Sequence, residues 1–356
     1  MAEVRLEHLV KRFEGLTAVD DVSLTIRSGE FLSLVGPSGC GKTTTLNLIA
    51  GFIAPDAGDI FVEGERLNKV PIYKRKMGMV FQSYALFPHM TVFDNIAFGL
   101  RMQKATDAVV RREINRALEL VRLPGVEQRY PRQLSGGQQQ RIALARALVI
   151  NPRVLLLDEP LSNLDAKLRK EMRIELRDIQ KAVGITAIFV THDQEEALSL
   201  SDRLAVMHRG RIEQVGSPIE IYETPRTEFV NTFIGETNLL TVRVLEIRGE
   251  EAQVDLGGQR MPVHRGDAAV ATGDQVKISI RPEKISINSS AGSSGLWLAA
   301  TVEHAVFVGN TTYYRMKAGG ETLAVLCQNL DARTFPPGEE VRLGFQADVC
   351  RLVGRA

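Results

Sequence analysis

The chain has 356 residues, enough for two or three domains. Hydrophobic residues make up 44% of it, as in an ordinary globular protein, and its 44 Lys and Arg residues nearly balance its 43 Asp and Glu residues. This balance argues against a protein that holds nucleic acid mainly by neutralising phosphates with a basic surface.

The three cysteines, Cys40, Cys327 and Cys350, lie far apart without CxxC spacing. We therefore expect neither a disulfide framework nor a zinc site. We also expect the protein to work in a reducing compartment. Residues 1–13 are charged throughout, unlike a signal peptide. No apolar run reaches the roughly 18 residues that span a bilayer. If the protein works at a membrane, we expect other chains to cross it.

The first part of the chain alternates between strand and helix patterns. Residues 4–13 and 22–35 read as strands, and "FLSLV" leads into the glycine-rich "GPSGCGKT". The next segment, 42–52, has helical spacing, with Leu46, Ile49 and Ala50 on one side and Gly51 as the expected C-cap. We expect a turn at 55–58.

The alternation continues to about residue 235. Helical patterns occupy about 106–122 and 136–149, while "VLLLDEP" and "ITAIFVTHD" are short apolar runs typical of buried parallel strands. This order predicts an α/β domain over residues 1–235, with a helical subdomain at about 83–150.

From residue 236 onward, alternating strand patterns predict an all-β second domain, and "SSAGSSG" at 289–295 predicts a flexible surface loop. Segments 273–287 and 338–352 match in pattern at an offset of 65. This echo suggests two related β segments that form one barrel-like unit, although alternating strands resemble each other in any case.

The stretch Gly36–Thr43 fits G-x-x-x-x-G-K-[ST], whose backbone N–H groups cradle phosphate at a helix N-terminus. In this pattern Lys42 reaches the β- and γ-phosphates and the Thr43 hydroxyl binds Mg²⁺. Cys40 inside the loop is either a thiol activated by the helix end or a small filler, and we favour the filler.

Asp158 and Glu159 follow the apolar run "VLLL", at the strand end where ligands bind in open α/β sheets. We expect Asp158 to hold Mg²⁺ and Glu159 to polarise the attacking water.

A second glycine-rich turn, "LSGGQQQR", begins at Leu134. Ser135 is a favoured N-cap, and the first turn of its helix has no lysine or acidic residue, so free N–H groups should present a second phosphate site. Because the first loop already surrounds its own nucleotide, the simplest geometry lets this turn complete a nucleotide held by another copy of the chain.

With "GPSGCGKT", "LSGGQ" and "VLLLDEP", the chain resembles the ATP-binding subunit of ABC transporters. Residues 236–356 are similar to the OB-type (TOBE) regulatory domain of sugar, polyamine and ferric-ion importer ATPases, with "NLL" at 238–240 and "RPEKI" at 281–285 as its marks. The implied fold is a P-loop NTPase with a mixed sheet and a helical subdomain, followed by an OB-like domain.

The resemblance also implies roles for single residues. Phe13 would stack on adenine, Gln82 would touch Mg²⁺ and link ATP to the permease, and His192 would contact the γ-phosphate and support Glu159. The implied catalytic residues are Glu159, His192, Lys42 and Gln82, and the implied metal ligands are Thr43, Gln82 and Asp158. The implied ATP-binding residues are Phe13, Gly36, Pro37, Ser38, Gly39, Cys40, Gly41, Lys42, Thr43, Thr44, Arg129, Ser135, Gly137 and Gln138.

"SNLDAKLR" is similar to the family's loop that meets its twin across a dimer through Asp165, although the family more often has alanine where Asn163 stands. The aromatic stretch 83–90 is either a groove for permease helices or core packing. The resemblance therefore implies an ATPase that closes as a homodimer around two Mg²⁺–ATP molecules.

The implied partners are two permease subunits and, indirectly, an external solute-binding protein, with no nucleic acid. The implied location is the cytoplasmic face of the membrane. "QSYALFPHMTV" is more similar to polyamine and ferric-ion importer ATPases than to the sugar group, and the tail resembles the polyamine type. We therefore expect spermidine and putrescine as the cargo, with ferric ion, phosphonate and sugar as alternatives. A non-transport ABC protein and an oligonucleotide-binding barrel switched by ATP are further alternatives. The first usually has two cassettes, and the second needs clustered aromatic and basic residues.

Overall fold

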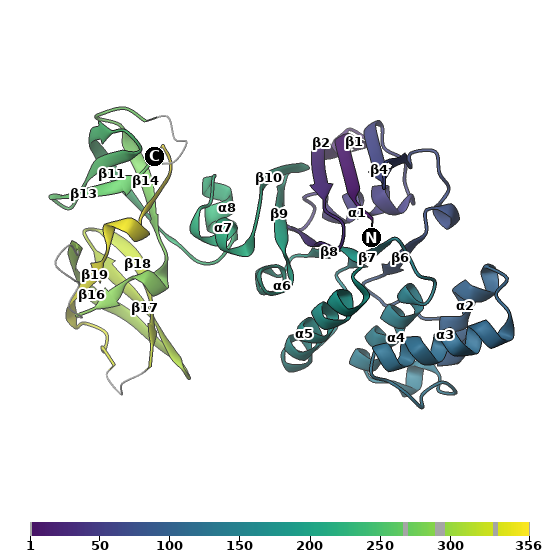
Figure 1. The fold of residues 1–356 in the computed structure, drawn as a ribbon. Helices are drawn as coiled ribbons and strands as arrows, with labels where there is room; N and C mark the ends of the chain where they lie inside the picture. The colour runs from purple at the N-terminus through teal and green to yellow at the C-terminus, as the bar shows by residue number, and fades with distance from the viewer. Residues whose placement is uncertain (1, 266–269, 289–295, 330–333, 356) are drawn as a thin grey trace. The chain divides into compact units, whose positions relative to one another are not determined.

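The computed structural model describes residues 2–265, 270–288, 296–329 and 334–355 (Figure 1). It divides into two compact units, Met1–Ile219 and Glu220–Ala356, which are described separately. The predicted loop at 289–295 lies outside the described residues. Among the described residues, no helix combines the length and apolar character needed to cross a membrane.

The first unit contains two sheets and a group of helices (Figure 1). Its strands are β1 Val4–Phe13, β2 Leu16–Ile26, β3 Phe31–Val35, β4 Ala57–Val62, β5 Glu65–Arg66, β6 Met77–Val80, β7 Val154–Asp158, β8 Thr186–Thr191, β9 Arg203–His208 and β10 Arg211–Gly216. Its helices are α1 Lys42–Ala50, α2 Val92–Met102, α3 Asp107–Leu120, α4 Gly136–Leu148, α5 Ala166–Val183 and α6 Gln194–Leu200, with short 3₁₀ helices η1 Ile72–Lys74 and η2 Pro131–Gln133.

The central sheet has the strand order β10-β9-β3-β8-β7-β6. Strands β9, β3, β8, β7 and β6 run parallel, and β10 pairs antiparallel with β9. The predicted parallel strands β7 and β8 are confirmed, and every residue of β8 is buried. Parallel strands covered on both faces become continuous apolar runs, which explains the sequence pattern.

A smaller antiparallel sheet has the order β2-β1-β4-β5. The predicted turn at 55–58 is only half right, because β4 already begins at Ala57. Gly58 has φ 84° and lies beside a register shift in β1, where a Cβ would come within 2.3 Å of the His8 carbonyl oxygen. The glycine therefore marks a bulge in a strand, which looks like a turn in the sequence.

Helix α1 ends as predicted at Gly51, which adopts φ 92°. Its residues Leu46, Ile49 and Ala50 are buried. Arg75 binds the carboxyl end of this helix, donating from Nη1 to the carbonyl oxygens of Leu48 and Ile49 at 2.9 and 2.8 Å. A cation at this end also interacts favourably with the negative end of the helix dipole.

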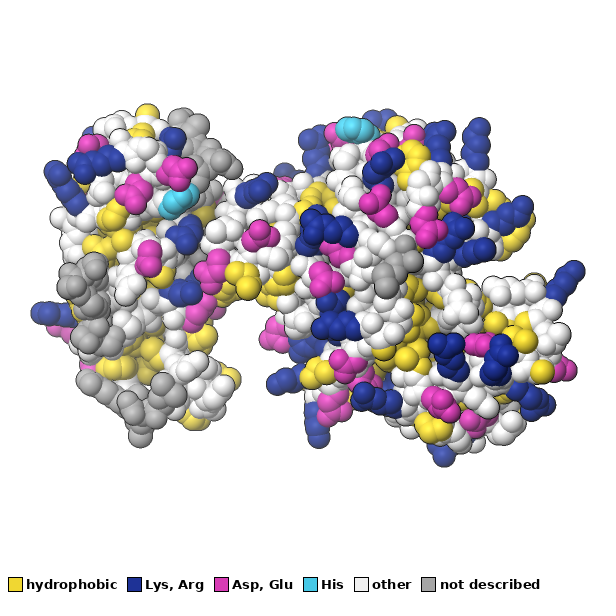
Figure 2. Space-filling view, viewed as in Figure 1, with side chains coloured by type: hydrophobic (Ala, Val, Ile, Leu, Met, Phe, Trp, Pro, Cys, Tyr) yellow, Lys and Arg dark blue, Asp and Glu magenta, His cyan; other side chains and the backbone are white. Residues whose placement is uncertain are grey.

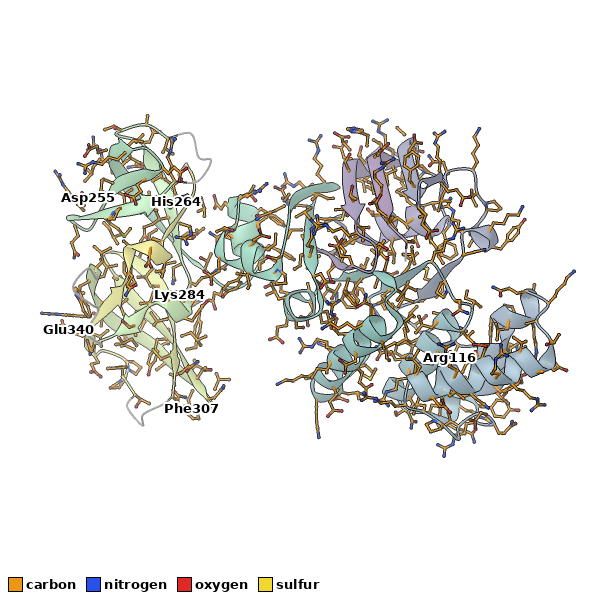
Figure 3. All side chains as sticks on the ribbon, viewed as in Figure 1. Arg116, Asp255, His264, Lys284, Phe307 and Glu340 are labelled. Atoms are coloured by element: carbon orange, nitrogen blue, oxygen red, sulfur yellow. The ribbon has the colours of Figure 1, made fainter. Side chains whose placement is uncertain are left out.

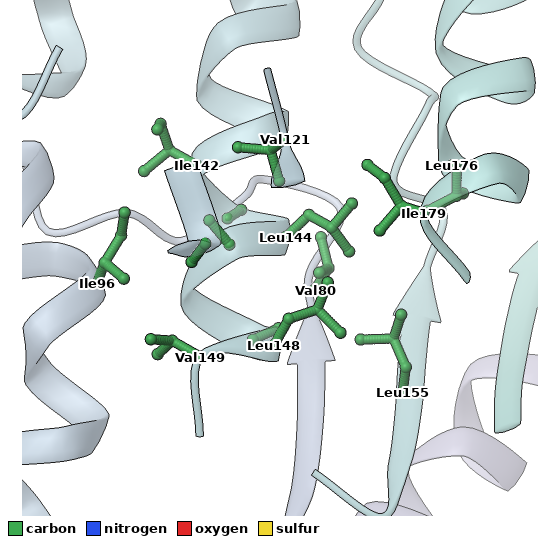
Figure 4. Packing of buried hydrophobic residues seen from close by; sticks show 14 of the residues in the cluster. Val80, Ile96, Val121, Ile142, Leu144, Leu148, Val149, Leu155, Leu176 and Ile179 are labelled. Atoms are coloured by element: carbon green, nitrogen blue, oxygen red, sulfur yellow. The ribbon is translucent and has the colours of Figure 1, made fainter. Parts of the chain in front are cut away.

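The helices α2, α3 and α4 form the helical part of the first unit, and α4 packs on β6 and β7 through a shared hydrophobic cluster (Figure 4). The helices predicted at 106–122 and 136–149 are α3 and α4. Helix α5 was not predicted, because its buried stripe of Met172, Leu176 and Ile179 is narrow and the rest of the helix is highly charged.

The second unit is built mainly from strands. Helix α7 Pro218–Glu223 spans the boundary, and α8 Glu228–Phe233 lies within the unit. Its strands are β11 Asn238–Arg248, β12 Glu251–Leu256, β13 Gln259–His264, β14 Gln275–Ile280, β15 Ser286–Ile287, β16 Leu296–Val308, β17 Thr311–Ala318, β18 Glu321–Gln328, β19 Glu340–Phe345 and β20 Arg351–Arg355, with 3₁₀ helices η3 Pro282–Lys284 and η4 Ala347–Val349.

These strands form a closed barrel, β11-β12-β13-β20-β14, and a five-stranded sheet, β15-β19-β16-β17-β18. The predicted repeat appears as two strand–3₁₀–strand segments, β14-η3-β15 and β19-η4-β20, whose elements start 65 residues apart. The single barrel-like unit predicted from the repeat was wrong, because the halves exchange their last strands. Thus β20 closes the barrel and β15 joins the other sheet, over one common hydrophobic core.

The division at residue 219 lies before the boundary predicted at 235, because α7 and α8 pack in the second unit. The buried Arg281 guanidinium donates to the carbonyl oxygens of Tyr222, Asn231 and Glu236, each at 3.1 Å. It also lies 4.3 Å from the centroid of the Tyr222 ring. One side chain from "RPEKI" thus fastens both helices to the barrel.

We expect the change Arg281→Ala to lower the free energy of unfolding of the second unit by about 2–4 kcal/mol, because three carbonyl oxygens lose a charged donor. Trp297, the only tryptophan of the chain, lies in β16 and reports on this unit by fluorescence during urea unfolding. Arg248→Ala, at an exposed arginine of the same barrel, is the matched control and should leave the transition nearly unchanged. Equal shifts in both variants would contradict this role of Arg281.

Candidate functional site

Four neighbouring strands of the central sheet end at one edge, in the order β3, β8, β7 and β6. In their parallel register Val35 pairs with Thr191, Val190 with Asp158, and Leu157 with Val80. The residues that follow these strands are the glycine-rich loop, His192, Glu159 and Gln82. The sheet therefore gathers four predicted site segments on one edge, as expected of ligand sites in α/β folds.

The glycine-rich loop, Gly36–Thr43, connects β3 to α1. A Cβ on Gly36 would lie 2.2 Å from the Met207 carbonyl oxygen, and one on Gly41, at φ 105°, would lie 2.3 Å from that of Ala18. Both positions therefore require glycine. Lys42 Nζ donates to the carbonyl oxygens of Gly36 and Pro37 at 2.7 and 2.9 Å, so its ammonium group lies across the loop.

The hydroxyl of Thr43 contacts the carboxylate of Asp158 across the edge of the sheet, with 3.2 Å between Oγ1 and Oδ1. Burial and the charge of Glu159 raise the pKa of Asp158, against the lowering effects of the Thr43 hydroxyl and Lys42. A half-buried carboxylate beside a hydroxyl is a set of hard oxygen donors, which fits Mg²⁺. Among the described residues no cluster of three or more His, Cys, Asp or Glu side chains could hold a metal.

Glu159 lies between the other two predicted polar residues. Its Oε2 is 3.1 Å from His192 Nδ1 and 3.5 Å from Gln82 Nε2. Its backbone has φ 44°, a left-handed conformation uncommon for a residue with a side chain, and its N–H donates to the Val190 carbonyl oxygen at 3.0 Å. Such backbone strain gathers at functional sites, where the surrounding structure enforces it.

The thiol of Cys40 is buried in the core beneath the loop. Burial raises its pKa, although the neighbouring Lys42 ammonium acts in the opposite direction. A raised pKa reduces the thiolate population, which supports the filler interpretation over that of an activated thiol.

Phe13 ends β1 at the turn into β2, and it is 43% exposed. Its ring is exposed despite its size, and Lys11 Nζ lies 5.3 Å from the ring centroid. An aromatic face open to solvent, next to a cation, can receive a flat ligand group.

Ser135 caps α4, as predicted, and the cap has a second half that was missed. Its hydroxyl accepts from the Gln138 N–H at 3.3 Å, and the Gln138 side chain accepts from the Ser135 N–H at 3.0 Å. The free N–H groups predicted at this helix start are therefore fewer than expected, because a capping box occupies those of Ser135 and Gln138.

Helix α4, which Ser135 caps, lies within the helical part of the first unit (Figure 1). Gly137 packs against α5, where a Cβ would meet the Leu168 side chain at 2.9 Å. Arg129 lies exposed on the connection between α3 and η2, and its backbone pairs with Val92 and Val126. No hydrogen bond or ion pair recorded for the described residues joins Ser135 or Arg129 to the phosphate loop of the same chain.

Two contacts at this edge were not predicted. Arg146 of α4 donates to the carbonyl oxygens of Tyr84 and Ala85 at 2.8 and 2.7 Å, and both of these residues have positive φ. Asn163 Nδ2 donates to the Gln82 carbonyl oxygen at 2.7 Å. Each pair is more than 60 residues apart and joins a side chain to a backbone oxygen, so no sequence spacing could reveal it.

The aromatic stretch 83–90 is partly core and partly surface. Tyr84 is buried, whereas the Phe87 ring packs 5.0 Å from that of Phe98, which is itself 41% exposed.

Charged side chains of both signs are interspersed over the face seen in Figure 2. In the second unit, Phe307 lies near the tip of the β16–β17 hairpin and is exposed (Figure 3).

Each of the two units contains a match to a different known protein family. The ABC transporter family model matches residues 19–162, and the TOBE domain model matches residues 278–353. The chain is 48% identical to the spermidine/putrescine import ATP-binding protein PotA of Rubrobacter xylanophilus, over 99% of this chain and 93% of that protein. It is 44% identical to the Fe(3+) ions import ATP-binding protein FbpC of Rhizobium etli, over 96% and 95%.

A solved structure described as dimeric, that of the bacterial ABC transporter cassette MJ0796, is 31% identical with a TM-score of 0.55 and covers 60% of this chain and 98% of that one. The P-loop fold and the β-rich second part predicted from the sequence are thereby confirmed. With such identity over nearly its whole length, the chain belongs to the ABC transporter family, as an ATP-binding subunit with ATPase activity.

Proposed function

We propose that this chain hydrolyses ATP to drive the import of spermidine and putrescine through a separate permease. The observation that carries the proposal is the 48% identity to a spermidine/putrescine import protein over 99% of the chain, together with the carboxylate of Glu159 placed between His192 and Gln82. The second candidate is ferric-ion import, favoured by the 44% identity to the Fe(3+) import protein.

In this proposal the loop from Gly36 to Thr44 binds the triphosphate through its backbone N–H groups. Lys42 exchanges its two loop carbonyl oxygens for phosphate oxygens. Thr43, Asp158 and Gln82 would hold Mg²⁺, which when bound would neutralise charge on the phosphates. The contact between Thr43 and Asp158 supports this, because it gathers oxygen donors at the loop. Phe13 stacks on the adenine ring.

Glu159 accepts a proton from the water that attacks the γ-phosphorus, while the bond from that phosphorus to the bridging oxygen of ADP breaks. His192, 3.1 Å from the carboxylate, keeps it oriented and reaches the γ-phosphate. Gln82 Nε2 lies 3.5 Å from the same oxygen. The carboxylate is thus held between two polar groups, as a general base requires.

A second copy completes the site. Ser135, Gly137, Gln138 and Arg129 contact the nucleotide of the partner, and Asp165 lies where the two copies meet. The place of the Ser135 turn in the helical part, unbonded to the loop of its own chain, supports this arrangement, as does the dimeric form of the related cassette.

Two permease subunits contact the surface around 83–90, which places the dimer at the cytoplasmic face of the membrane. An external solute-binding protein delivers the cargo, and no nucleic acid takes part.

We expect the change Glu159→Gln to lower ATP hydrolysis by about 100-fold or more, because the amide cannot accept a proton from water. ATP binding should persist, so the variant should accumulate as an ATP-loaded dimer. Phosphate release measures the first effect, and light scattering after size-exclusion chromatography with ATP measures the second. Glu171→Gln, on the exposed surface of α5, is the matched control. Hydrolysis at the wild-type rate in Glu159→Gln would remove Glu159 from this role.

Cys40 should react slowly with iodoacetamide at pH 7 and faster at pH 9. Its pKa is raised, so the reactive thiolate is scarce at neutral pH and grows as the pH rises. Bound ATP should protect it, and its alkylation should block ATP binding by bulk. Peptide mass spectrometry gives the rates, with Cys327 and Cys350 of the second unit as internal controls that ATP does not protect. Full ATP binding after complete modification of Cys40 would contradict its place in the loop.

Deleting the gene should reduce uptake of labelled spermidine and putrescine by the source cells and leave ferric-ion uptake unchanged. Re-expression of the wild-type chain should restore uptake, and Glu159→Gln should not. Loss of ferric-ion uptake with normal polyamine uptake would favour the second candidate.

A further inference from the structure

Asn163 joins two segments of the site. It lies in the connection between β7 and α5, and its Nδ2 donates at 2.7 Å to the backbone oxygen of Gln82, 81 residues earlier in the chain. The side chain of the same glutamine approaches the carboxylate of Glu159 at 3.5 Å. We propose that Asn163 is a positioning residue that holds Gln82 against Glu159, an inference that rests on the proposed role of Glu159.

The Asn163 end of this link is fixed relative to Glu159. Ser162 Oγ donates to the Glu159 carbonyl oxygen at 2.9 Å, and the Ser162 N–H donates to the same oxygen at 3.2 Å. Leu161 and Leu164, on either side, are buried. The turn from 159 to 164 therefore behaves as one rigid piece, and Asn163 projects from it at a set position.

The Gln82 end has few other supports. Gln82 lies beyond β6 in a turn closed by the Tyr84 N–H and the Phe81 carbonyl oxygen, 2.9 Å apart. Arg146 holds the next two carbonyl oxygens, those of Tyr84 and Ala85. The Gln82 oxygen is thus the point where this turn is tied to the catalytic carboxylate's own segment.

The bond contributes little to stability, because Asn163 and Gln82 are both exposed and water can replace either partner. What water cannot supply is a fixed distance between the two segments. Alanine at this position would leave the Gln82 oxygen without this donor. The Asn163 side-chain amide therefore acts by fixing the position of the Gln82 segment, and it adds little to the stability of the fold.

The hydrogen bond between Asn163 and Gln82 also lies close in sequence to the proposed dimer contact. Asp165, two residues after Asn163, caps α5 by accepting from the Leu168 N–H at 3.0 Å. In the proposed dimer this cap lies where the copies meet. A shift of the turn on closure would therefore move Asn163, and with it Gln82, relative to the nucleotide.

The test compares Asn163→Ala and Asn163→Asp in the full-length chain, with Glu171→Gln as control. Both variants should lower kcat about three- to tenfold, the loss of one positioning hydrogen bond, and change the KM for ATP less than about twofold. Their thermal melting temperatures should stay close to that of the wild type. This split separates positioning from a general loss of folding.

A comparison of the two variants provides a readout that a structural role would not move. In Asn163→Asp the introduced carboxylate is ionised at neutral pH, so it repels the Gln82 oxygen instead of donating to it. Alanine neither donates to this oxygen nor repels it. The kcat of Asn163→Asp should therefore be lower than that of Asn163→Ala at pH 7.5. Glu159, His192 and Asp165 are present in both variants, so their effects cancel in this comparison.

Unchanged kcat in both variants, or a kcat of Asn163→Asp that equals or exceeds that of Asn163→Ala, overturns the proposal for Asn163. So does a parallel loss of ATP affinity and melting temperature. In each of these cases a Glu159→Gln variant that still loses turnover leaves the proposed function standing. If Glu159→Gln hydrolyses ATP normally, the proposed function itself fails, whatever the Asn163 variants do.

Discussion

The parallel register of β3, β8, β7 and β6 is the constraint on which the site depends. Neighbouring strands lie about 4.8 Å apart, so residues that follow paired positions must come close together. The phosphate loop, His192, Glu159 and Gln82 are spread over more than 150 residues of sequence, yet each is the continuation of one of these four strands. A slip of one residue in any strand would turn its continuation away from the others.

The second constraint is the turn that follows β7. Glu159 adopts a left-handed backbone, which costs about 1 kcal/mol or more and persists only because the surroundings impose it. Its N–H is held by β8, its carbonyl oxygen by Ser162, and the turn continues directly into the cap of α5. The backbone of Glu159 is therefore held at both its N–H and its carbonyl oxygen, and His192 and Gln82 contact the carboxylate itself.

The sequence predicted what local chemistry determines. Gly51 and Ser135 were recognised as caps because the residue types that satisfy helix ends are few. The parallel strands were recognised because burial on both faces leaves an apolar run. The contacts of Asn163 and Arg146 could not be predicted, since they join side chains to backbone oxygens far away in the chain. The exchange of β15 and β20 was hidden for the same reason, because a repeat in pattern does not say which sheet each strand joins.

The capping box at Ser135 bears on how a dimer could open and close. In the single chain the Ser135 hydroxyl and the Gln138 amide N–H are bonded to each other, so the turn is satisfied without nucleotide. Giving up such a cap costs about 0.5–2 kcal/mol. Charge-assisted bonds to a γ-phosphate are about twice as strong as neutral ones and can offset that cost, whereas bonds to water cannot. If the partner's nucleotide takes these donors, as proposed, closure depends on the terminal phosphate being present, and its release returns the turn to a state that is already stable on its own.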